Sequence, residues 1–201
     1  MTFAAFVDES LAAIRALPPG GDVLGQVFRS HALRRTGTWV EFGVAGGTSL
    51  RRMAAERGAA RLWGFDTFTG LPERWTRKDS LDFPAGAFAQ GHVPITEGAH
   101  LVTGLFQDTL PAWRPETDVT FAHVDCDIYS AAACVLEFLP SVMARGAVVL
   151  FDELVNYPGF EDHEMRALYE AHGRGLRWEW LAAYGGPEQW PNEPVAIRVT
   201  S

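Results

Sequence analysis

In the stretch VEFGVAGGTSL, residues 40–50, a strand-like run ends in glycines and is followed by a helical pattern, which indicates the fold class of this chain. The β-branched and aromatic residues before the turn are typical of a buried strand, and Gly58 ends the helix that follows. Gly43 allows the turn as the chain leaves the strand. Ala45 and Gly47 have small or no side chains and leave space above the backbone. A ligand can therefore approach the start of the helix, and the stretch predicts a site of the nucleotide-binding kind.

Strands and helices alternate along the rest of the chain. We expect strands at 38–43, 61–66, 100–105, 119–125, 147–153, 176–184 and 194–200, and helices at 3–17, 22–35, 46–58, 128–146 and 159–173. Such alternation predicts an α/β fold of the Rossmann-like, doubly wound type, with a mostly parallel sheet, right-handed crossovers and helices on both faces. The last two strands are joined by a short linker without a helix, so we expect them to be antiparallel to each other.

The length of the chain bounds its organisation. The 201 residues are enough for one compact domain with a substantial core and few for two. We expect a single domain, with residues 1–36 as an N-terminal helical cap and residues 37–201 as the Rossmann-like core. Residues 67–99 are rich in proline, glycine, aromatic and charged residues. This segment is predicted to be a long loop, with at most one short helix, that shapes the substrate pocket as a lid.

The composition argues against several classes of partner. The formal net charge is −8 and the pI is near 5.2, which disfavours nucleic acid, because phosphate binding needs clustered Lys and Arg. The basic residues at 74–78 are interpreted as a solvated loop. Cys126 and Cys134 are the only cysteines and are expected to be reduced thiols. The N-terminus lacks a signal-peptide pattern and no apolar run approaches about 20 residues, so we expect a cytoplasmic protein without a membrane partner.

Carboxylates stand where the predicted strands end. They are Glu41, Asp66, Asp125, Asp127, Asp152 and Glu153. Because the ligands of open parallel sheets bind beyond the carboxyl ends of the strands, these side chains are expected to converge on one site. Four acidic strand ends together predict a ligand that is cationic, a metal ion or rich in hydroxyl groups.

Three details bear on the identity of the ligand. Ala45 stands where a dinucleotide-binding turn usually has its middle glycine. Glu41 lies in the approach to the turn, where a carboxylate suits an ammonium group and opposes a pyrophosphate. The chain also leaves little room for the substrate domain that most dehydrogenases carry. S-adenosylmethionine, which has a sulfonium and an adenosine but no phosphate, fits all three; an NAD-dependent oxidoreductase and a cofactor-binding module without turnover remain as alternatives.

Five segments resemble those of a known family in order and spacing. They are VEFGVAGGTSL, GFDTFTGLPE, GLFQDTLP, HVDCDIYS and GAVVLFDE, and the similarity covers residues 38–170. The chain resembles class I S-adenosylmethionine-dependent methyltransferases and, more narrowly, the macrocin O-methyltransferase group. This resemblance implies O-methylation of a hydroxyl on a small molecule such as a sugar or natural product. It also implies a seven-stranded sheet with an antiparallel last strand, and a homodimer.

The resemblance further assigns roles to individual residues. In metal-dependent relatives three acids hold a magnesium ion, and Asp125, Asp152 and Glu153 match them. Asp127 matches the proposed general base, so Asp125 and Asp127 are the catalytic candidates. Asp66 would bind the ribose. The cofactor site as a whole would comprise Glu41, Gly43, Ala45, Gly47, Thr48, Asp66, Thr67, Phe68, Gly104, Phe106 and Asp125.

The chain departs from the family pattern at the end of the fifth predicted strand, and several of its side chains allow two interpretations. Glu153 and Leu154 replace the second aspartate and the tyrosine that the family usually has. His123 is interpreted as a core histidine, and His163 as a histidine on a helix surface rather than a base. The segment after the fifth strand brings Tyr157, His163 and Glu164 near the site. Four aromatic residues either line an acceptor pocket or form a satellite cluster under the long loop: Phe68, Trp75, Phe83 and Phe88.

Overall fold

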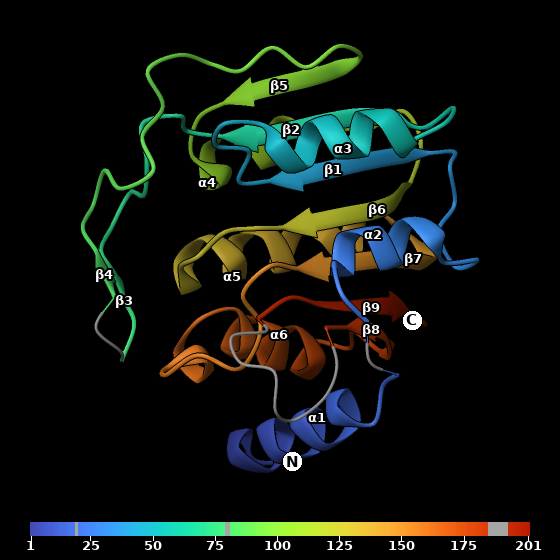
Figure 1. Ribbon diagram of the computed structural model, residues 1–201, viewed down its shortest axis with the longest axis vertical. Helices are drawn as coiled ribbons and strands as arrows, with labels where there is room; N and C mark the ends of the chain where they lie inside the picture. The colour runs from blue at the N-terminus through green and yellow to red at the C-terminus, as the bar shows by residue number, and fades with distance from the viewer. Residues whose placement is uncertain (19, 79–80, 185–192) are drawn as a thin grey trace.

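The computed structural model describes residues 1–18, 20–78, 81–184 and 193–201, which form a central sheet of seven strands with helices on both faces (Figure 1). All seven expected strands are present. The turn expected at 185–193 lies outside the described residues except for its last one. The strands are β1 (Thr38–Phe42), β2 (Arg61–Asp66), β5 (Ala99–Thr103), β6 (Val119–Val124), β7 (Met143–Phe151), β8 (Trp178–Ala183) and β9 (Val195–Val199).

The strand order confirms the predicted fold class. It is β5-β2-β1-β6-β7-β9-β8, so the chain builds outward from β1 in both directions. The pairs between β5, β2, β1, β6 and β7 are parallel, whereas β9 runs antiparallel to both β7 and β8. The last strand is therefore the antiparallel one, as expected. The carboxyl ends of the five parallel neighbours meet at one edge, on the left in Figure 1.

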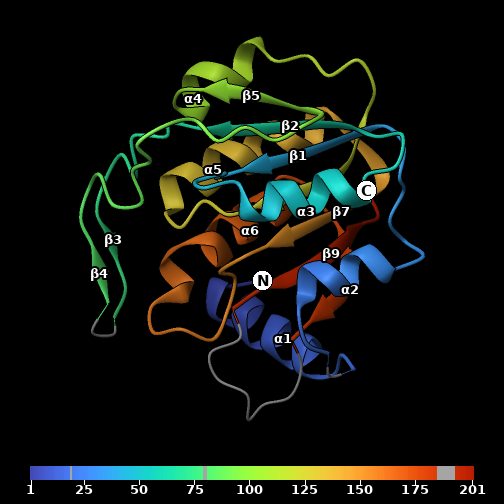
Figure 2. The same cartoon turned by 45° about the horizontal axis from the view of Figure 1, so that its top comes forward.

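Two hydrophobic clusters, one on each face of the sheet, hold the helices in place. α2 (Val23–Arg29) and α3 (Thr48–Glu56) share a cluster with Trp39 of β1. α1 (Phe3–Arg15), α5 (Tyr129–Phe138) and α6 (Glu164–Gly173) share the other with Val40 and Phe42. Figure 2 shows α3 in front of the sheet and α5 behind it. Alternate residues of β1 thus serve opposite faces. Within the described ranges, none of the helices is long and apolar enough to cross a lipid bilayer.

Two helices end earlier than their sequence pattern indicates. α2 stops at Arg29 rather than at residue 35, because Ser30 is extended and its hydroxyl accepts a hydrogen bond from the N–H of Ala32 at 3.1 Å. α5 stops at Phe138 rather than at residue 146, because Pro140 lies in a short 3₁₀ turn that ends the helix. The apolar residues beyond these ends belong to loops or to the next strand.

Two further boundaries lie elsewhere than expected. Gly146, predicted to end a helix, lies inside β7 with φ +79°, where the pairing with β6 shifts register between Val119 and Phe121. α6 begins at Glu164 rather than at Gly159, because a 3₁₀ turn precedes it. A bulge and a tight turn both place a residue where regular periodicity does not.

The 67–99 segment contains a small hairpin and no described helix. Its strands are β3 (Trp75–Thr76) and β4 (Asp82–Phe83), which pair antiparallel. The hairpin lies beyond the carboxyl edge of the main sheet, at the left of Figure 1. It therefore stands on the side where a ligand of this fold is expected to bind.

The ends of β1 and β6 approach so closely that only glycine fits at position 43. The N–H of Gly43 donates to the carbonyl of Phe65 and the N–H of Asp125 donates to the carbonyl of Phe42, both at 2.9 Å. A Cβ at Gly43 would lie 1.8 Å from the carbonyl oxygen of Asp125, and φ there is +90°. The backbone that carries the predicted site is thus fixed on both sides of β1.

We expect Gly43→Ala to lower the free energy of unfolding by more than about 2 kcal/mol, because it adds both a steric clash and left-handed strain. Urea unfolding measures this change. Gly173→Ala is the matched control: it lies at the end of α6 with nothing within 4 Å of its Cβ position, so it should be neutral or slightly stabilising. Equal stability of the two variants would show that β1 and β6 can separate freely.

Candidate active site

A cavity of about 400 Å³ opens at the carboxyl edge of the sheet, a size typical of sites for small molecules. Its walls come from the glycine turn after β1, the end of β2 with the loop after it, the start of α4 (Phe106–Thr109), and the ends of β6 and β7. The location follows from the topology, because the parallel strands all end there. The cavity therefore collects the side chains that the sequence places at strand ends.

Asp66 at the end of β2 fixes the glycine turn. Its Oδ2 accepts hydrogen bonds from the N–H groups of Val44 at 2.8 Å and Ala45 at 2.7 Å, and its Oδ1 accepts one from Phe68 at 2.7 Å. Ala45 has φ +42°, a conformation that costs a residue other than glycine about 1–3 kcal/mol. The turn is thus held in one conformation by a carboxylate that also lines the cavity.

Three carboxylates face the cavity from the ends of β6 and β7. One oxygen of each of Asp125, Asp127 and Glu153 lies within 4.8 Å of the others. Burial and the charge of Asp152 raise the pKa of Asp125 well above its ordinary value and the pKa of Asp127 to about 7. Burial and the charge of Asp125 raise the pKa of Glu153 as well. A cationic ligand would relieve the repulsion that these shifts report.

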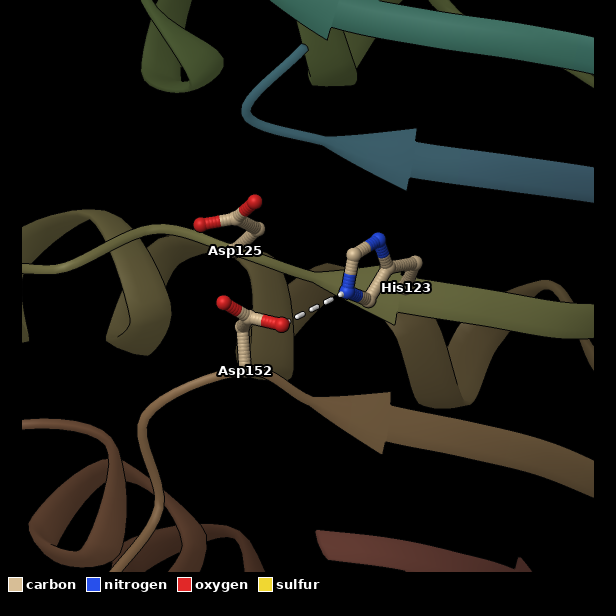
Figure 3. Close-up of side chains that lie close together, drawn as sticks. All are labelled: His123, Asp125 and Asp152. Atoms are coloured by element: carbon tan, nitrogen blue, oxygen red, sulfur yellow. Dashed lines mark ion pairs between the residues drawn. The ribbon is translucent and has the colours of Figure 1, made fainter. Parts of the chain in front are cut away.

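His123 lies on β6 next to these carboxylates, with its side chain 2% exposed. Its Nδ1 is 2.8 Å from Oε1 of Glu41, its register partner on β1, and its Nε2 is 3.5 Å from Oδ1 of Asp152 (Figure 3). Burial lowers the pKa of His123, but Asp152 and Glu41 outweigh burial and raise it well above its ordinary value. Burial raises the pKa of Asp152 in turn, and His123 brings it below its ordinary value.

Glu164, the first residue of α6, lies fully buried behind the cavity. Its Oε1 accepts a hydrogen bond from the N–H of Cys126 at 3.4 Å, and its Oε2 has no hydrogen-bond partner among the described residues. Burial and the charges of Asp152 and Asp127 raise the pKa of Glu164 to about 8. A buried carboxylate thus connects the start of α6 to the end of β6.

Comparison with known proteins identifies the family. Residues 40–154, more than half of the chain, match the model of a family described as a methyltransferase domain. The chain belongs to this methyltransferase family. The prediction of a methyltransferase is therefore confirmed, and methyl transfer is favoured over NAD-dependent oxidation. No curated protein matches the sequence.

Solved structures of other methyltransferases share the fold. A structure of CalS11, a calicheamicin methyltransferase, has 24% identity and a TM-score of 0.62 over 98% of this chain and 77% of that one. Apo CalS11, described as a TDP-rhamnose 3′-O-methyltransferase of calicheamicin biosynthesis, has 27% identity and a TM-score of 0.59 over 87% of this chain and 76% of that one. An O-methyltransferase from Bacillus cereus in complex with SAH has 15% identity and a TM-score of 0.57 over 99% and 90%.

The methyltransferase cavity brings together many of the residues singled out in the sequence. Those that line it are Gly43, Ala45, Asp66, Thr67, Phe106, Asp125, Asp127 and Glu153. Those outside its lining are Glu41, Gly47, Thr48, Phe68, Gly104 and Asp152. The proposed metal triad is divided: Asp152 groups with Asp125 and His123, whereas Glu153 groups with Asp125 and Asp127.

Two residues of the methyltransferase differ from their interpretation in the sequence. Arg77, interpreted as part of a solvated loop, has a side chain only 8% exposed, with Nη2 2.9 Å from Oε1 of Glu193 and its guanidinium 4.3 Å from the ring centre of Tyr157. It lines the cavity, and no sequence signal indicated this. His163, interpreted as a surface residue, is buried, and its Nε2 donates a hydrogen bond to the carbonyl of Thr76 at 3.1 Å. It holds the hairpin in place.

We expect Glu164→Gln to stabilise the methyltransferase increasingly as the pH rises. Its pKa is about 8 in the folded protein against 4.5 ordinarily, so between these values only the folded state keeps the proton. The contribution of Glu164 to the free energy of unfolding is therefore fully present below pH 4.5 and is lost as the pH rises toward 8. Glutamine keeps the acceptor for Cys126 and removes the charge.

Urea unfolding in the presence of a chelator at pH 5 and pH 8 measures this effect. The difference in free energy of unfolding between Glu164→Gln and wild type should be larger at pH 8 than at pH 5, in favour of the variant, by more than about 1 kcal/mol. Glu9→Gln on the exposed surface of α1 should follow wild type at both values. A Glu164→Gln protein that loses stability relative to wild type at the higher pH would contradict the burial of an unfavourable charge.

Proposed function

We propose that the protein transfers the methyl group of S-adenosylmethionine to a hydroxyl of a small molecule, in the manner of the macrocin O-methyltransferase group. The observation that carries the proposal is that the glycine turn, Asp66, Asp125 and Asp127 line one cavity in a chain of a methyltransferase family. The turn provides space for the cofactor backbone. The acids beside the turn suit a sulfonium and an acceptor that must lose a proton.

The proposed position of the cofactor follows from the residues in each wall of the cavity. Gly43 and Ala45 would accommodate the methionine end, and Leu105 and Phe106 would pack against the adenine. A carboxylate has about four lone-pair sites, and three backbone N–H groups already occupy Asp66, so about one is left for a ribose hydroxyl. Asp66 would therefore both hold the turn and bind the sugar.

Asp127 is proposed as the general base. Methyl transfer is an in-line displacement, so the acceptor oxygen must lie opposite the sulfur and lose its proton as the bond forms. Asp127 lines the cavity, and its φ of +60° is a conformation that residues other than glycine rarely adopt. Strain of this kind persists where the surrounding structure fixes a side chain, which is consistent with a positioned base.

A divalent cation is proposed at Asp125, Asp152 and Glu153. These residues fit a hard cation, because they offer carboxylate oxygens and because Oε2 of Glu153 is buried without a hydrogen-bond partner among the described residues. When bound, magnesium would act as a Lewis acid that lowers the pKa of the acceptor hydroxyl. The residues themselves would orient the acceptor and balance charge.

The acceptor is proposed to enter beside the hairpin. Trp75, Arg77 and Phe88 line that side of the cavity, and Phe83 stacks on Trp75 with ring centres 5.1 Å apart. The aromatic residues of the loop thus form a cluster that also supplies part of the wall. CalS11, the 27% identical relative, is described as acting on TDP-rhamnose. A hydroxyl-bearing sugar or natural product is the acceptor class that fits this likeness.

The proposal includes the partner, the cellular location and the oligomeric state of the enzyme. The acidic net charge of −8 supports a small molecule rather than nucleic acid as the partner. A cytoplasmic location and a homodimer rest on the sequence pattern and on the family resemblance. Light scattering of the purified protein would test the dimer.

Asp66→Ala should weaken the binding of S-adenosylhomocysteine more than tenfold, since it removes the ribose contact and releases the turn. Calorimetry at high micromolar ligand measures both proteins. Asp8→Ala, an exposed change on α1, should bind as wild type does. Unchanged affinity in Asp66→Ala would remove this residue from the site, and stabilisation by NAD without binding of S-adenosylhomocysteine would contradict the proposed function.

Asp127→Asn should lower methyl transfer by about 10²–10⁴-fold, because the amide cannot accept the proton of the acceptor. Radiolabelled donor and a panel of hydroxyl-bearing acceptors measure turnover, with calorimetry of S-adenosylhomocysteine on the same samples. Cofactor affinity should stay within about threefold, because the shape of the side chain is kept. Asp8→Asn on the exposed surface of α1 is the control. Turnover of Asp127→Asn at the wild-type rate would exclude the residue as the base.

A further inference from the structure

The environment of His123 is unusual for a histidine in a hydrophobic sheet. Its neighbour Glu41 is 0% exposed, and its register position on β1 places it directly across from His123. A buried carboxylate without a strong partner would be costly, so the contact of 2.8 Å between Oε1 and Nδ1 is needed to hold Glu41 in the core. The pair is therefore a fixed unit at the end of two neighbouring strands.

This contact determines which ring nitrogen is available. A carboxylate oxygen accepts hydrogen bonds, so the Nδ1–H of His123 donates a hydrogen bond to Oε1 of Glu41. In the neutral ring the Nε2 is then left with a lone pair. That nitrogen is buried, has no hydrogen-bond partner among the described residues, and lies toward Asp152 and Asp125 (Figure 3).

We propose that Nε2 of His123 is a ligand of the divalent cation, together with carboxylate oxygens of Asp125 and Asp152, and that Glu41 is a positioning residue that orients the ring. The inference rests on the proposed metal site, and in this ligand set the nitrogen of His123 takes the place of Glu153. Histidines that bind metals almost always donate their other N–H to a carboxylate or carbonyl, as His123 does to Glu41.

The spacing of the three side chains agrees with one shared ion. The Nε2 of His123 is 3.5 Å from Oδ1 of Asp152, and an oxygen of Asp125 lies within 4.8 Å of both. Two ligands at about 2.1 Å from one ion lie between about 3 and 4.2 Å apart, so small rotations of Asp125 complete the set. Glu153 groups with Asp125 and Asp127.

The ligand set implies a preference among metals. Carboxylates suit magnesium, calcium and manganese, whereas an imidazole nitrogen suits zinc, copper, iron and nickel, so the mixed set shifts the preference from magnesium toward divalent transition metals. Methyl transfer requires no change of oxidation state, so the ion serves as a charge and a template. The competing interpretation is an imidazolium that only balances the charges of Glu41 and Asp152, in which case Nε2 keeps its proton and no metal binds there.

Pulsed electron paramagnetic resonance of the full chain loaded with Mn²⁺ separates these interpretations. Wild type should show coupling to a directly bound nitrogen, and ¹⁵N-histidine labelling should change that signal. His123→Gln should lose the coupling, and His100→Gln on the exposed part of edge strand β5 should keep it. Glu41→Gln should keep the coupling and weaken Mn²⁺ binding by about 10–100-fold, because the ring loses its charged partner.

Each outcome decides the inference. Mn²⁺ that binds without nitrogen coupling, coupling that persists in His123→Gln, or no Mn²⁺ binding would overturn it. The labelled wild-type protein needs no substitution, so a variant that fails to fold leaves the test intact. Calorimetry of S-adenosylhomocysteine on the same samples keeps the proposals apart: a bound cofactor with oxygen-only Mn²⁺ contradicts this inference alone, and nitrogen coupling without cofactor binding contradicts the proposed function alone.

Discussion

Mutual repulsion among carboxylates at one edge of the sheet is the constraint on which the rest of this structure depends. Asp125, Asp127 and Glu153 hold one oxygen each within 4.8 Å of the others, and Glu164 is buried behind them. Burial and like charge raise the pKa of each of these groups, which means that the fold opposes their ionisation. Parallel strands that end together impose this arrangement, because their carboxyl ends cannot diverge within one sheet.

Hydrogen bonds and close backbone contacts hold the walls of the cavity rigid. Asp66 ties three backbone N–H groups, and Gly43 brings the ends of β1 and β6 into contact. Of the residues other than glycine with positive φ, Ala45, Phe88 and Asp127 line the cavity. Each such conformation costs about 1–3 kcal/mol and persists only where the surrounding structure enforces it. The site is therefore prearranged for its ligand and does not form around it.

The fold class could be predicted from the sequence because the local sequence patterns agree with the tertiary structure of the sheet. Every strand of the main sheet could be recognised as a short apolar run bounded by turns, and the glycine turn marked where the first of them ends and the next helix begins. The predicted helix boundaries are wrong where tertiary contacts override local sequence preferences. Gly146 is a helix-ending residue by propensity, yet it lies in β7 at a bulge against β6. Pro140 marks the true end of α5, but an apolar pattern continues past it into the strand.

Only those site residues that stand at the ends of strands could be predicted from the sequence. Asp66, Asp125 and Asp127 stand at strand ends, and the topology alone brings them to one cavity. The pairing of Glu41 with His123 depends on which strands are neighbours and in what register, and β1 and β6 are far apart in the sequence. Arg77 depends on the folding of a loop without periodicity, which composition does not determine.

The same charges link stability to binding. A carboxylate that resists ionisation in the empty cavity gains most from a cation, so the groups that destabilise the free protein are those that would strengthen the bound state. Replacing Asp125 or Glu153 by an amide would remove repulsion and ligand affinity together. A sequence optimised only for stability would therefore not keep four acids at this edge. Their presence beside a buried histidine and a strained turn is explained by a binding function and not by the fold.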